Sequence, residues 1–151
     1  MKKSEIAKQR FEEGYNCAQA VAMAYAEEMN MDPLTVAGLV CGYGGGMGRM
    51  REVCGAVSGM TFVISALYGY RQPHDNEKKA QLYGYVQQVA NEFRNINGSI
   101  VCRELLGLAE KGPQSPVPQA RTAEYYKKRP CVRLVEIAAD ILERFIAEKE
   151  K

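Results

Sequence analysis

Apolar residues recur at helical spacing along most of the chain, and Gly, Pro, Asn and Asp separate the apolar stretches. The clearest case is the segment 76–97, in which Leu82, Val86, Val89 and Phe93 follow at intervals of four, three and four residues. This spacing places the four side chains on one face of an α-helix. No segment alternates apolar and polar residues as a strand does. The pattern predicts an all-α fold, a single-domain helical bundle of about five to seven helices with a glycine-rich loop.

Residues that cap or break helices divide this pattern into segments. Four residues with short polar side chains are expected to be N-caps: Ser4, Asn16, Asp32 and Ser99. Gly14 leaves two alternatives open, a break between two helices or a kink in one continuous helix. We expect helices over 4–13, 17–29, 33–41, 52–70, 76–97 and 100–107, then a helical turn or two around 123–127, and a last helix with Pro130 at its first position.

Length and charge narrow the class of protein. A chain of 151 residues can bury a core of its own, so we expect one helical domain over 1–151, with the proline-rich stretch 112–118 as a surface connection. The net charge of +2 comes from interspersed signs and gives no support to a nucleic-acid partner. No apolar run is long enough to span a membrane and the N-terminus has no apolar core segment. We therefore expect no membrane association, no signal peptide and a cytoplasmic location.

The chain has five cysteines, Cys17, Cys41, Cys54, Cys102 and Cys131. An odd number argues against the fully paired disulfide framework of a small secreted protein. The two nearest, Cys41 and Cys54, are 13 positions apart, which excludes CxxC redox motifs, zinc ribbons, ferredoxin-type runs and haem attachment. Any site that uses several of these thiols must therefore be assembled by the fold.

Four of the five thiols share a position relative to the predicted helices. Cys17, Cys54, Cys102 and Cys131 each fall in a first turn, where free N–H groups and the helix dipole favour a thiolate. Cys41 falls at a helix C-terminus, where the dipole acts in the opposite sense. Cys54, between a glycine-rich loop and an apolar helix, is the best single candidate for chemistry. The alternative is that all these residues pack in the core, the commonest fate of a free cysteine.

The stretch 42–48 holds too many glycines for a helix or strand interior. It fits no GxGxxG register and no Walker A lysine follows it, so we expect no nucleotide site. Its N–H groups suit an anion or the sulfurs of a cluster, with Arg51 assisting, and the alternative is a tight packing loop. The candidate cofactor-binding residues are Gly44, Gly45, Gly46, Gly48 and Arg49. One turn apart in the next helix, Gly55 and Gly59 would let another helix or a cofactor approach closely.

These motifs also resemble those of a known family. NCAQ at 16–19, GGGMGR at 44–49, CGAVSG at 54–59, NGS at 97–99 and Pro-Cys at 130–131 follow the order of the C-GCAxxG-C-C family of redox-active proteins. The resemblance spans residue 11 to about residue 135. It implies a small helical protein with Cys17, Cys54, Cys102 and Cys131 as signature cysteines, holding an iron–sulfur cluster or another prosthetic group. Cys41 has no counterpart in the motif.

The leading hypothesis is a helical redox protein whose four signature thiols converge. They would bind an iron–sulfur cluster or another metal, or form a reversible dithiol–disulfide set, in electron transfer or redox sensing. With His74 as the only histidine, Ser/His/Asp or Cys/His catalysis has no basis, and whether the protein is an enzyme stays open. A redox partner protein and a homodimer are the partners considered. The rival hypothesis is a structural or interaction module whose cysteines only pack.

Overall fold

Eight α-helices and one short 3₁₀-helix account for most of the described chain in the computed structural model, which describes residues 1–109 and 112–151 (residue 128 through its backbone only). They are α1 (Lys3–Glu12), α2 (Cys17–Met23), α3 (Pro33–Val40), η1 (Cys41–Tyr43), α4 (Gly55–Tyr68), α5 (Asn76–Asn97), α6 (Cys102–Leu105), α7 (Ala123–Lys128) and α8 (Cys131–Lys149). The all-α prediction is confirmed. The eight helices exceed the five to seven expected, because the turns expected around residues 123–127 form a helix of their own, α7, of six residues.

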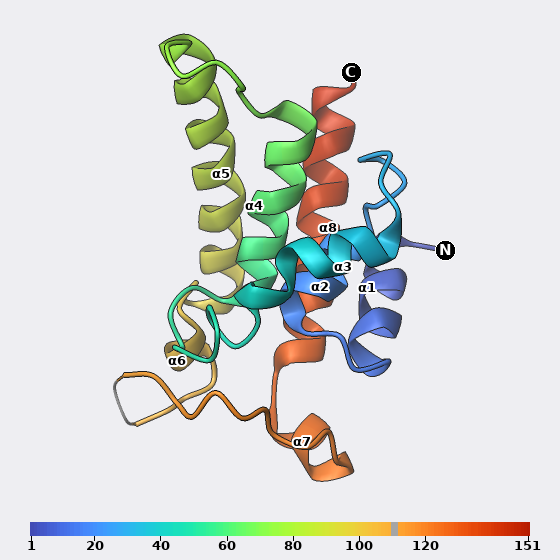
Figure 1. Cartoon of the computed structure of the whole chain (residues 1–151), viewed down its shortest axis with the longest axis vertical. Coiled ribbons are helices and arrows are strands. Elements are labelled where there is room, and N and C mark those ends of the chain that lie inside the picture. The colour runs from blue at the N-terminus through green and yellow to red at the C-terminus, as the bar shows by residue number, and fades with distance from the viewer. Residues whose placement is uncertain (110–111) are drawn as a thin grey trace.

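Three long helices, α4, α5 and α8, lie side by side, and α1 and α2 pack against the part of α8 nearer its N-terminus (Figure 1). The predicted apolar stripe of α8 is buried: Leu134, Ala138, Ile141 and Phe145. Tyr25, in the turns after α2, is also buried, and its hydroxyl donates a hydrogen bond to the Ala139 carbonyl of α8 at 2.6 Å. The tip of α5 lies at one end of the molecule, and α6, α7 and the loops around them lie at the other (Figure 1).

Two glycines of α4 allow α2 to approach closely. A Cβ atom at Gly59 would lie 2.9 Å from the Ala18 carbonyl oxygen, and one at Gly55 would lie 3.0 Å from the Ala18 nitrogen and 3.1 Å from the Cys17 Cβ. The close approach predicted from these glycines is therefore made by a helix. It also brings the N-terminus of α2, with Cys17, against the N-terminus of α4.

Two predicted caps are found at α2 and α3. Asn16 accepts a hydrogen bond from the Gln19 N–H at 2.9 Å, and the Gln19 side chain accepts one from the Asn16 N–H at 3.0 Å, which forms a capping box. The Asp32 carboxylate accepts bonds from the N–H groups of Leu34 and Thr35, both at 3.1 Å. Gly14, with φ of +107°, breaks the chain between α1 and α2, so the two-helix alternative is the right one.

The N-cap predictions for Ser4 and Ser99 are wrong. α1 begins at Lys3, so Ser4 lies inside it, and the Glu5 carboxylate instead accepts a hydrogen bond from the Lys2 N–H at 3.0 Å. Ser99 closes a turn before α6: its hydroxyl accepts from the Val101 N–H at 2.9 Å and donates to Glu104 at 2.6 Å. At both sites a side chain bonds to a nearby backbone N–H group outside the helix, an arrangement that competes with N-capping by the serine.

Three helix boundaries also differ from the prediction. α2 ends at Met23 rather than near residue 29, because the N–H groups of Tyr25 and Ala26 bond to carbonyls three residues back instead of four. α4 begins at Gly55 rather than near residue 52. Pro130 is the N-cap of α8 rather than its first residue. Within the described ranges, no helix has the length and apolar character needed to cross a bilayer.

The glycine-rich loop between η1 and α4 contains a left-handed turn. Five consecutive residues, 45–49, have φ between +56° and +70°, and Arg51 has φ of +60°. Left-handed backbone costs a residue with a side chain about 1–2 kcal/mol, which explains why three of these five positions are glycine. Gly46 also has no room for a side chain, because a Cβ there would lie 2.7 Å from the Cys102 Cβ and 2.8 Å from the Arg51 Cα. The loop is therefore fitted closely against the start of α6.

Candidate thiol site

A short antiparallel contact brings Cys54 and Cys102 to one face. An isolated bridge joins Val53 to Val101. Two backbone bonds hold it: Cys54 N–H to Ile100 O at 2.8 Å and Cys102 N–H to Glu52 O at 2.6 Å. Since successive residues of extended chain point to opposite faces, Cys54 and Cys102 share the face that Val53 and Val101 do not occupy.

This contact also explains why Cys54 lies outside the helix. Residues that pair across the bridge are extended and cannot belong to a helical turn, so α4 starts only after Cys54. Cys54 is the N-cap of α4, which corrects its predicted place in the first turn. Cys17, Cys102 and Cys131 are the first residues of α2, α6 and α8, as the sequence predicts.

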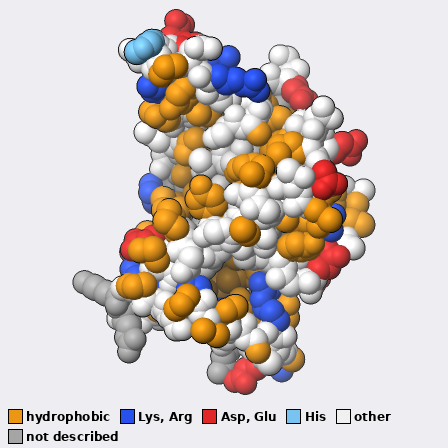
Figure 2. All heavy atoms as spheres, in the orientation of Figure 1, with side chains coloured by type: hydrophobic (Ala, Val, Ile, Leu, Met, Phe, Trp, Pro, Cys, Tyr) orange, Lys and Arg blue, Asp and Glu red, His pale blue; other side chains and the backbone are white. Residues whose placement is uncertain are grey.

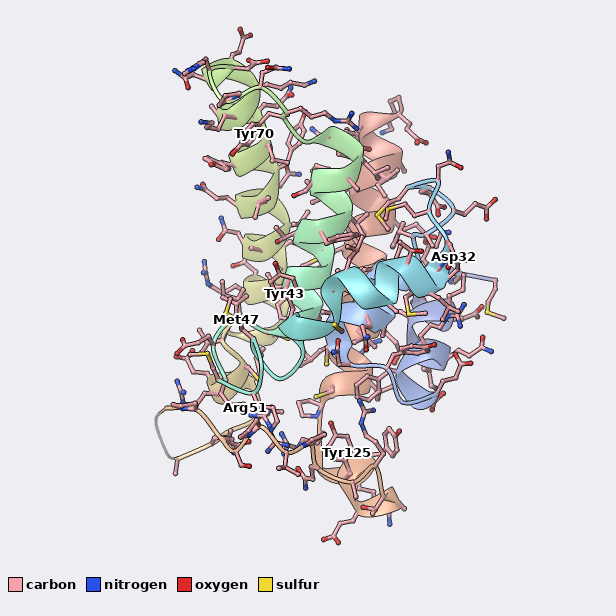
Figure 3. All side chains as sticks on the ribbon, viewed as in Figure 1. Asp32, Tyr43, Met47, Arg51, Tyr70 and Tyr125 are labelled. Carbon is pink, nitrogen blue, oxygen red and sulfur yellow. The ribbon has the colours of Figure 1, made fainter. Side chains whose placement is uncertain are left out.

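All four of these thiols line one cavity. It measures about 460 Å³, counting the space open to solvent at its mouth. Gly45 and Gly46 of the glycine-rich loop form part of its wall. Arg51, which comes from the same loop, and Tyr125 of α7 also line it, and both lie at the lower end of the molecule in Figure 3. The fold thus brings together residues that are widely separated in the sequence.

Cys17 and Cys131 interact directly. Hydrogen bonding from the Cys17 thiol lowers the pKa of Cys131 to about 7, more than burial raises it, and the charges of Arg129 and Arg121 lower it further. The same hydrogen bond, followed by burial, raises the pKa of Cys17 well above its ordinary value of 9.0. When this pair loses a proton, the negative charge is therefore favoured on Cys131 and the remaining proton on Cys17.

The other two thiols stay protonated. Burial raises the pKa of Cys54 to about 12, although the N–H groups of Ala56 and Val57 act in the opposite direction. Burial also raises the pKa of Cys102, and the hydrogen bond that Arg51 Nη1 donates to its sulfur at 3.5 Å offsets part of that rise. The expectation that a helix N-terminus makes Cys54 a thiolate is wrong, because desolvation outweighs the N–H groups there.

The fifth cysteine stands apart from these four. Cys41 is exposed at the C-terminal end of α3, as predicted, and its thiol donates a hydrogen bond to the Gly38 carbonyl at 3.2 Å. It lines a second, adjoining cavity. Gly44, Gly45, Gly48 and Arg49, four of the five candidate cofactor-binding residues, line that second cavity as well.

The donor chemistry of the thiol cavity suits a soft metal, since thiolates are the ligands of zinc and of iron–sulfur clusters. The arrangement of these side chains differs from that of a metal site. Across the described part of the chain, no three His, Cys, Asp or Glu side chains are grouped so that they would hold one metal ion. The thiols are thus arranged here as one interacting pair, Cys17 and Cys131, with Cys54 and Cys102 beside it.

Several residues of the site were not found from the sequence. Arg121 and Arg129 lie beside Cys131, and Tyr125 lies between them in the sequence. Arg121 donates hydrogen bonds to the carbonyls of Phe11 at 3.2 Å and Tyr15 at 3.0 Å, which fixes it against the end of α1 and the connection to α2. The basic stretch around Arg129, directly before Pro130 and Cys131, is a signal that the sequence does contain. Nothing in the sequence indicates Arg121.

The sequence profile of one protein family matches residues 15–145 of this chain, a range that includes all four thiols of the cavity. That family is described as "Putative redox-active protein (C_GCAxxG_C_C)". No curated protein and no solved structure matches the chain significantly.

Proposed function

We propose, since this chain belongs to the C-GCAxxG-C-C family of redox-active proteins, that it exchanges electrons through a reversible disulfide between Cys17 and Cys131. The observation that carries the proposal is the interaction of these two thiols, which leaves Cys131 with a pKa of about 7. A thiolate is the nucleophile of thiol–disulfide exchange, and an attacking thiol is most effective when its pKa lies near the ambient pH.

The two thiols have different roles in this reaction. The Cys131 thiolate attacks one sulfur of an incoming disulfide, forms a mixed disulfide with it and expels the other half as a thiolate. The Cys17 thiol gives its proton to that thiolate, attacks the Cys131 sulfur and expels the second half. Two electrons pass to the incoming disulfide, which leaves as one thiol and one thiolate, and the thiolate takes its proton from water; the protein retains a Cys17–Cys131 disulfide. A reduced dithiol partner reverses the sequence.

The surroundings favour Cys131 as the attacking thiol. Arg121 and Arg129 stabilise its negative charge, and it begins α8, a helix of 19 residues whose dipole points its positive end at the sulfur. Cys54 and Cys102 remain thiols at neutral pH because burial raises both pKa values. They are therefore poor competitors for the oxidant.

A second candidate is an iron–sulfur cluster or other metal centre held by all four cysteines. What favours it is that Cys54 and Cys102 line the same cavity as the reactive pair, which a single disulfide does not require. Such a centre would supply one-electron chemistry. The four arginines that line this cavity or its neighbour, Arg49, Arg51, Arg121 and Arg129, would balance the negative charge of the thiolates.

One protein preparation, analysed first for metal and then after oxidation, distinguishes the two candidate functions. Protein purified without oxygen is analysed for metal and sulfide, then oxidised with glutathione disulfide and mapped by mass spectrometry. The dithiol proposal predicts the loss of two thiols and a Cys17–Cys131 cross-linked peptide, with Cys41→Ser as a control that forms the same cross-link. Stoichiometric iron and sulfide that Cys54→Ser and Cys102→Ser both lose would favour the cluster. Cysteines that neither oxidise nor bind metal would favour simple packing.

A further inference from the structure

A second cavity adjoins the thiol cavity and is lined by arginine. It measures about 870 Å³, counting the space open to solvent, and its arginines are Arg49, Arg51 and Arg121. The two cavities share five lining residues: Asn16, Gly45, Arg51, Arg121 and Tyr125. Figure 2 shows a hollow near the lower end of the molecule with basic side chains at its edge. Neither cavity has an Asp or Glu among its described lining residues.

The arginines of this second cavity donate hydrogen bonds only to neutral groups. Gln114 Oε1 accepts hydrogen bonds from Arg49 Nη2 at 3.1 Å and from Arg51 Nε at 2.9 Å. Arg121 donates to two backbone carbonyls. Among the described residues, no carboxylate forms an ion pair with any of the three. Arg51 is nevertheless only 6% exposed. The charges of Arg51 and Arg121 lower the pKa of Cys131, so its thiolate offsets part of their charge, but no described carboxylate does the same for Arg49. Buried cations are costly, and an anion bound in this cavity would reduce that cost.

One guanidinium is also incompletely bonded. Arg49 Nε is buried and has no hydrogen-bond partner. Burial lowers the pKa of Arg49, and the charges of Arg51 and Arg129 lower it further, so the cationic groups here repel one another. The loop backbone places Arg49 and Arg51 in the left-handed region, with φ of +64° and +60°, although neither residue favours it. Strained backbone that concentrates unpaired charge is typical of binding sites.

We propose that the arginine cleft formed by Arg49, Arg51 and Arg121 binds the phosphate or carboxylate group of a small anionic ligand. Guanidinium groups present planar, rigid donors that match these oxyanions in two-point geometry. The Arg49 guanidinium has one hydrogen-bonded side-chain partner, Gln114, and its Nε has none, so this side chain keeps donor capacity for a ligand. The shared lining places the rest of such a ligand next to the thiol cavity. This binding site does not depend on the proposed redox function.

Calorimetric titration with inorganic phosphate and with succinate, at constant ionic strength set by sodium chloride, tests the cleft. We expect saturable binding of at least one of the two anions, and the one that binds with higher affinity shows whether the site prefers phosphate or carboxylate. Arg49→Gln should weaken that binding about 10- to 100-fold, since it removes a charge-assisted donor. The matched control is Arg94→Gln on α5, where the side chain bonds to Asn91 at the surface, and it should bind as the wild type does. No binding by either anion, or equal weakening by both variants, would overturn the proposal.

A second measurement covers the case in which a variant folds poorly. Iodoacetate and iodoacetamide alkylate thiols alike but differ in charge. The quantity measured is the alkylation rate of Cys131 with iodoacetate divided by its rate with iodoacetamide. In the folded wild-type protein this ratio should be higher than in the unfolded chain, because the arginines attract the negatively charged reagent. Added phosphate should bring the ratio down to that of the unfolded chain. A native ratio no higher than the unfolded one would contradict the cleft. Phosphate binding in a protein that forms no Cys17–Cys131 disulfide would retain the cleft and refute the redox function.

Discussion

The low pKa of Cys131 depends mainly on one hydrogen bond, and Cys17→Ala removes it. In the wild-type protein the pKa of Cys131 is about 7, against an ordinary value of 9.0, and hydrogen bonding from Cys17 is the largest cause of the difference. A full return to 9.0 would correspond to a loss of about 3 kcal/mol of thiolate stabilisation, at about 1.4 kcal/mol per pKa unit. At pH 7 the thiolate fraction would then fall from about one half to about 1%.

The assay is the pH dependence of alkylation of Cys131 by iodoacetamide, followed by mass spectrometry of the peptide. Cys17→Ala should slow alkylation at pH 7 by at least about 10-fold and shift the midpoint to higher pH. Cys17→Ser is the matched control, because its hydroxyl still donates a hydrogen bond and should keep the midpoint low. An unchanged midpoint in Cys17→Ala, or the same shift in both variants, would refute the role assigned to the hydrogen bond.

The remaining predictions concern stability. Because the folded-state pKa of Cys131 lies below its ordinary value of 9.0, this thiol adds stability that is complete above about pH 9 and is lost as the pH falls through about 7. The free energy of unfolding, measured with urea, should rise by roughly 1–3 kcal/mol between pH 6 and pH 9 in the wild-type protein but not in Cys131→Ala. The same pH dependence of stability in both proteins would contradict this prediction. Gly46→Ala should lower the free energy of unfolding by about 2–5 kcal/mol, because its Cβ would be in strained left-handed backbone and would clash with its neighbours. Gly48→Ala has the same backbone strain but nothing within 4 Å of its Cβ, so it should lose only about 1–2 kcal/mol. Equal losses would disprove the close fit of the loop. Tyr25→Phe should lose about 1–2 kcal/mol with its buried hydrogen bond, while Tyr83→Phe, at an exposed pair of hydroxyls, should lose almost nothing.

The parts of the fold that depend on local chemistry could be predicted from the sequence. Asn16 and Asp32 cap helices because the N–H groups they satisfy lie within three residues, and that spacing is visible in the chain. The apolar stripe of α8 is visible for the same reason. Ser99 could not be placed correctly, because residues 100–102 pair with residues 52–54 and are held extended. No local signal reports such a contact.

The candidate site divides in the same way. The prediction that four cysteines share a location rests on their motifs, and the fold does bring Cys17, Cys54, Cys102 and Cys131 to one cavity. Their chemical roles are not settled by that placement and stay proposals. Which thiol ionises could not be predicted, since the helix dipole is a local effect and burial is not. Burial keeps Cys54 protonated, whereas the Cys17 thiol from a distant segment and the charges of Arg129 and Arg121 favour the thiolate of Cys131.

The central claim is that Cys131 attacks an oxidant and Cys17 resolves the product. Cys17→Ser protein treated with glutathione disulfide at pH 7 tests it most directly, by intact mass and peptide mapping under acid quench. Without its resolving partner, Cys131 should accumulate as a stable mixed disulfide with glutathione, while Cys131→Ser should leave Cys17 unmodified because burial still raises the pKa of Cys17 above its ordinary value. Glutathione attached mainly to Cys54 or Cys102, or to Cys17 as readily as to Cys131, would contradict the account.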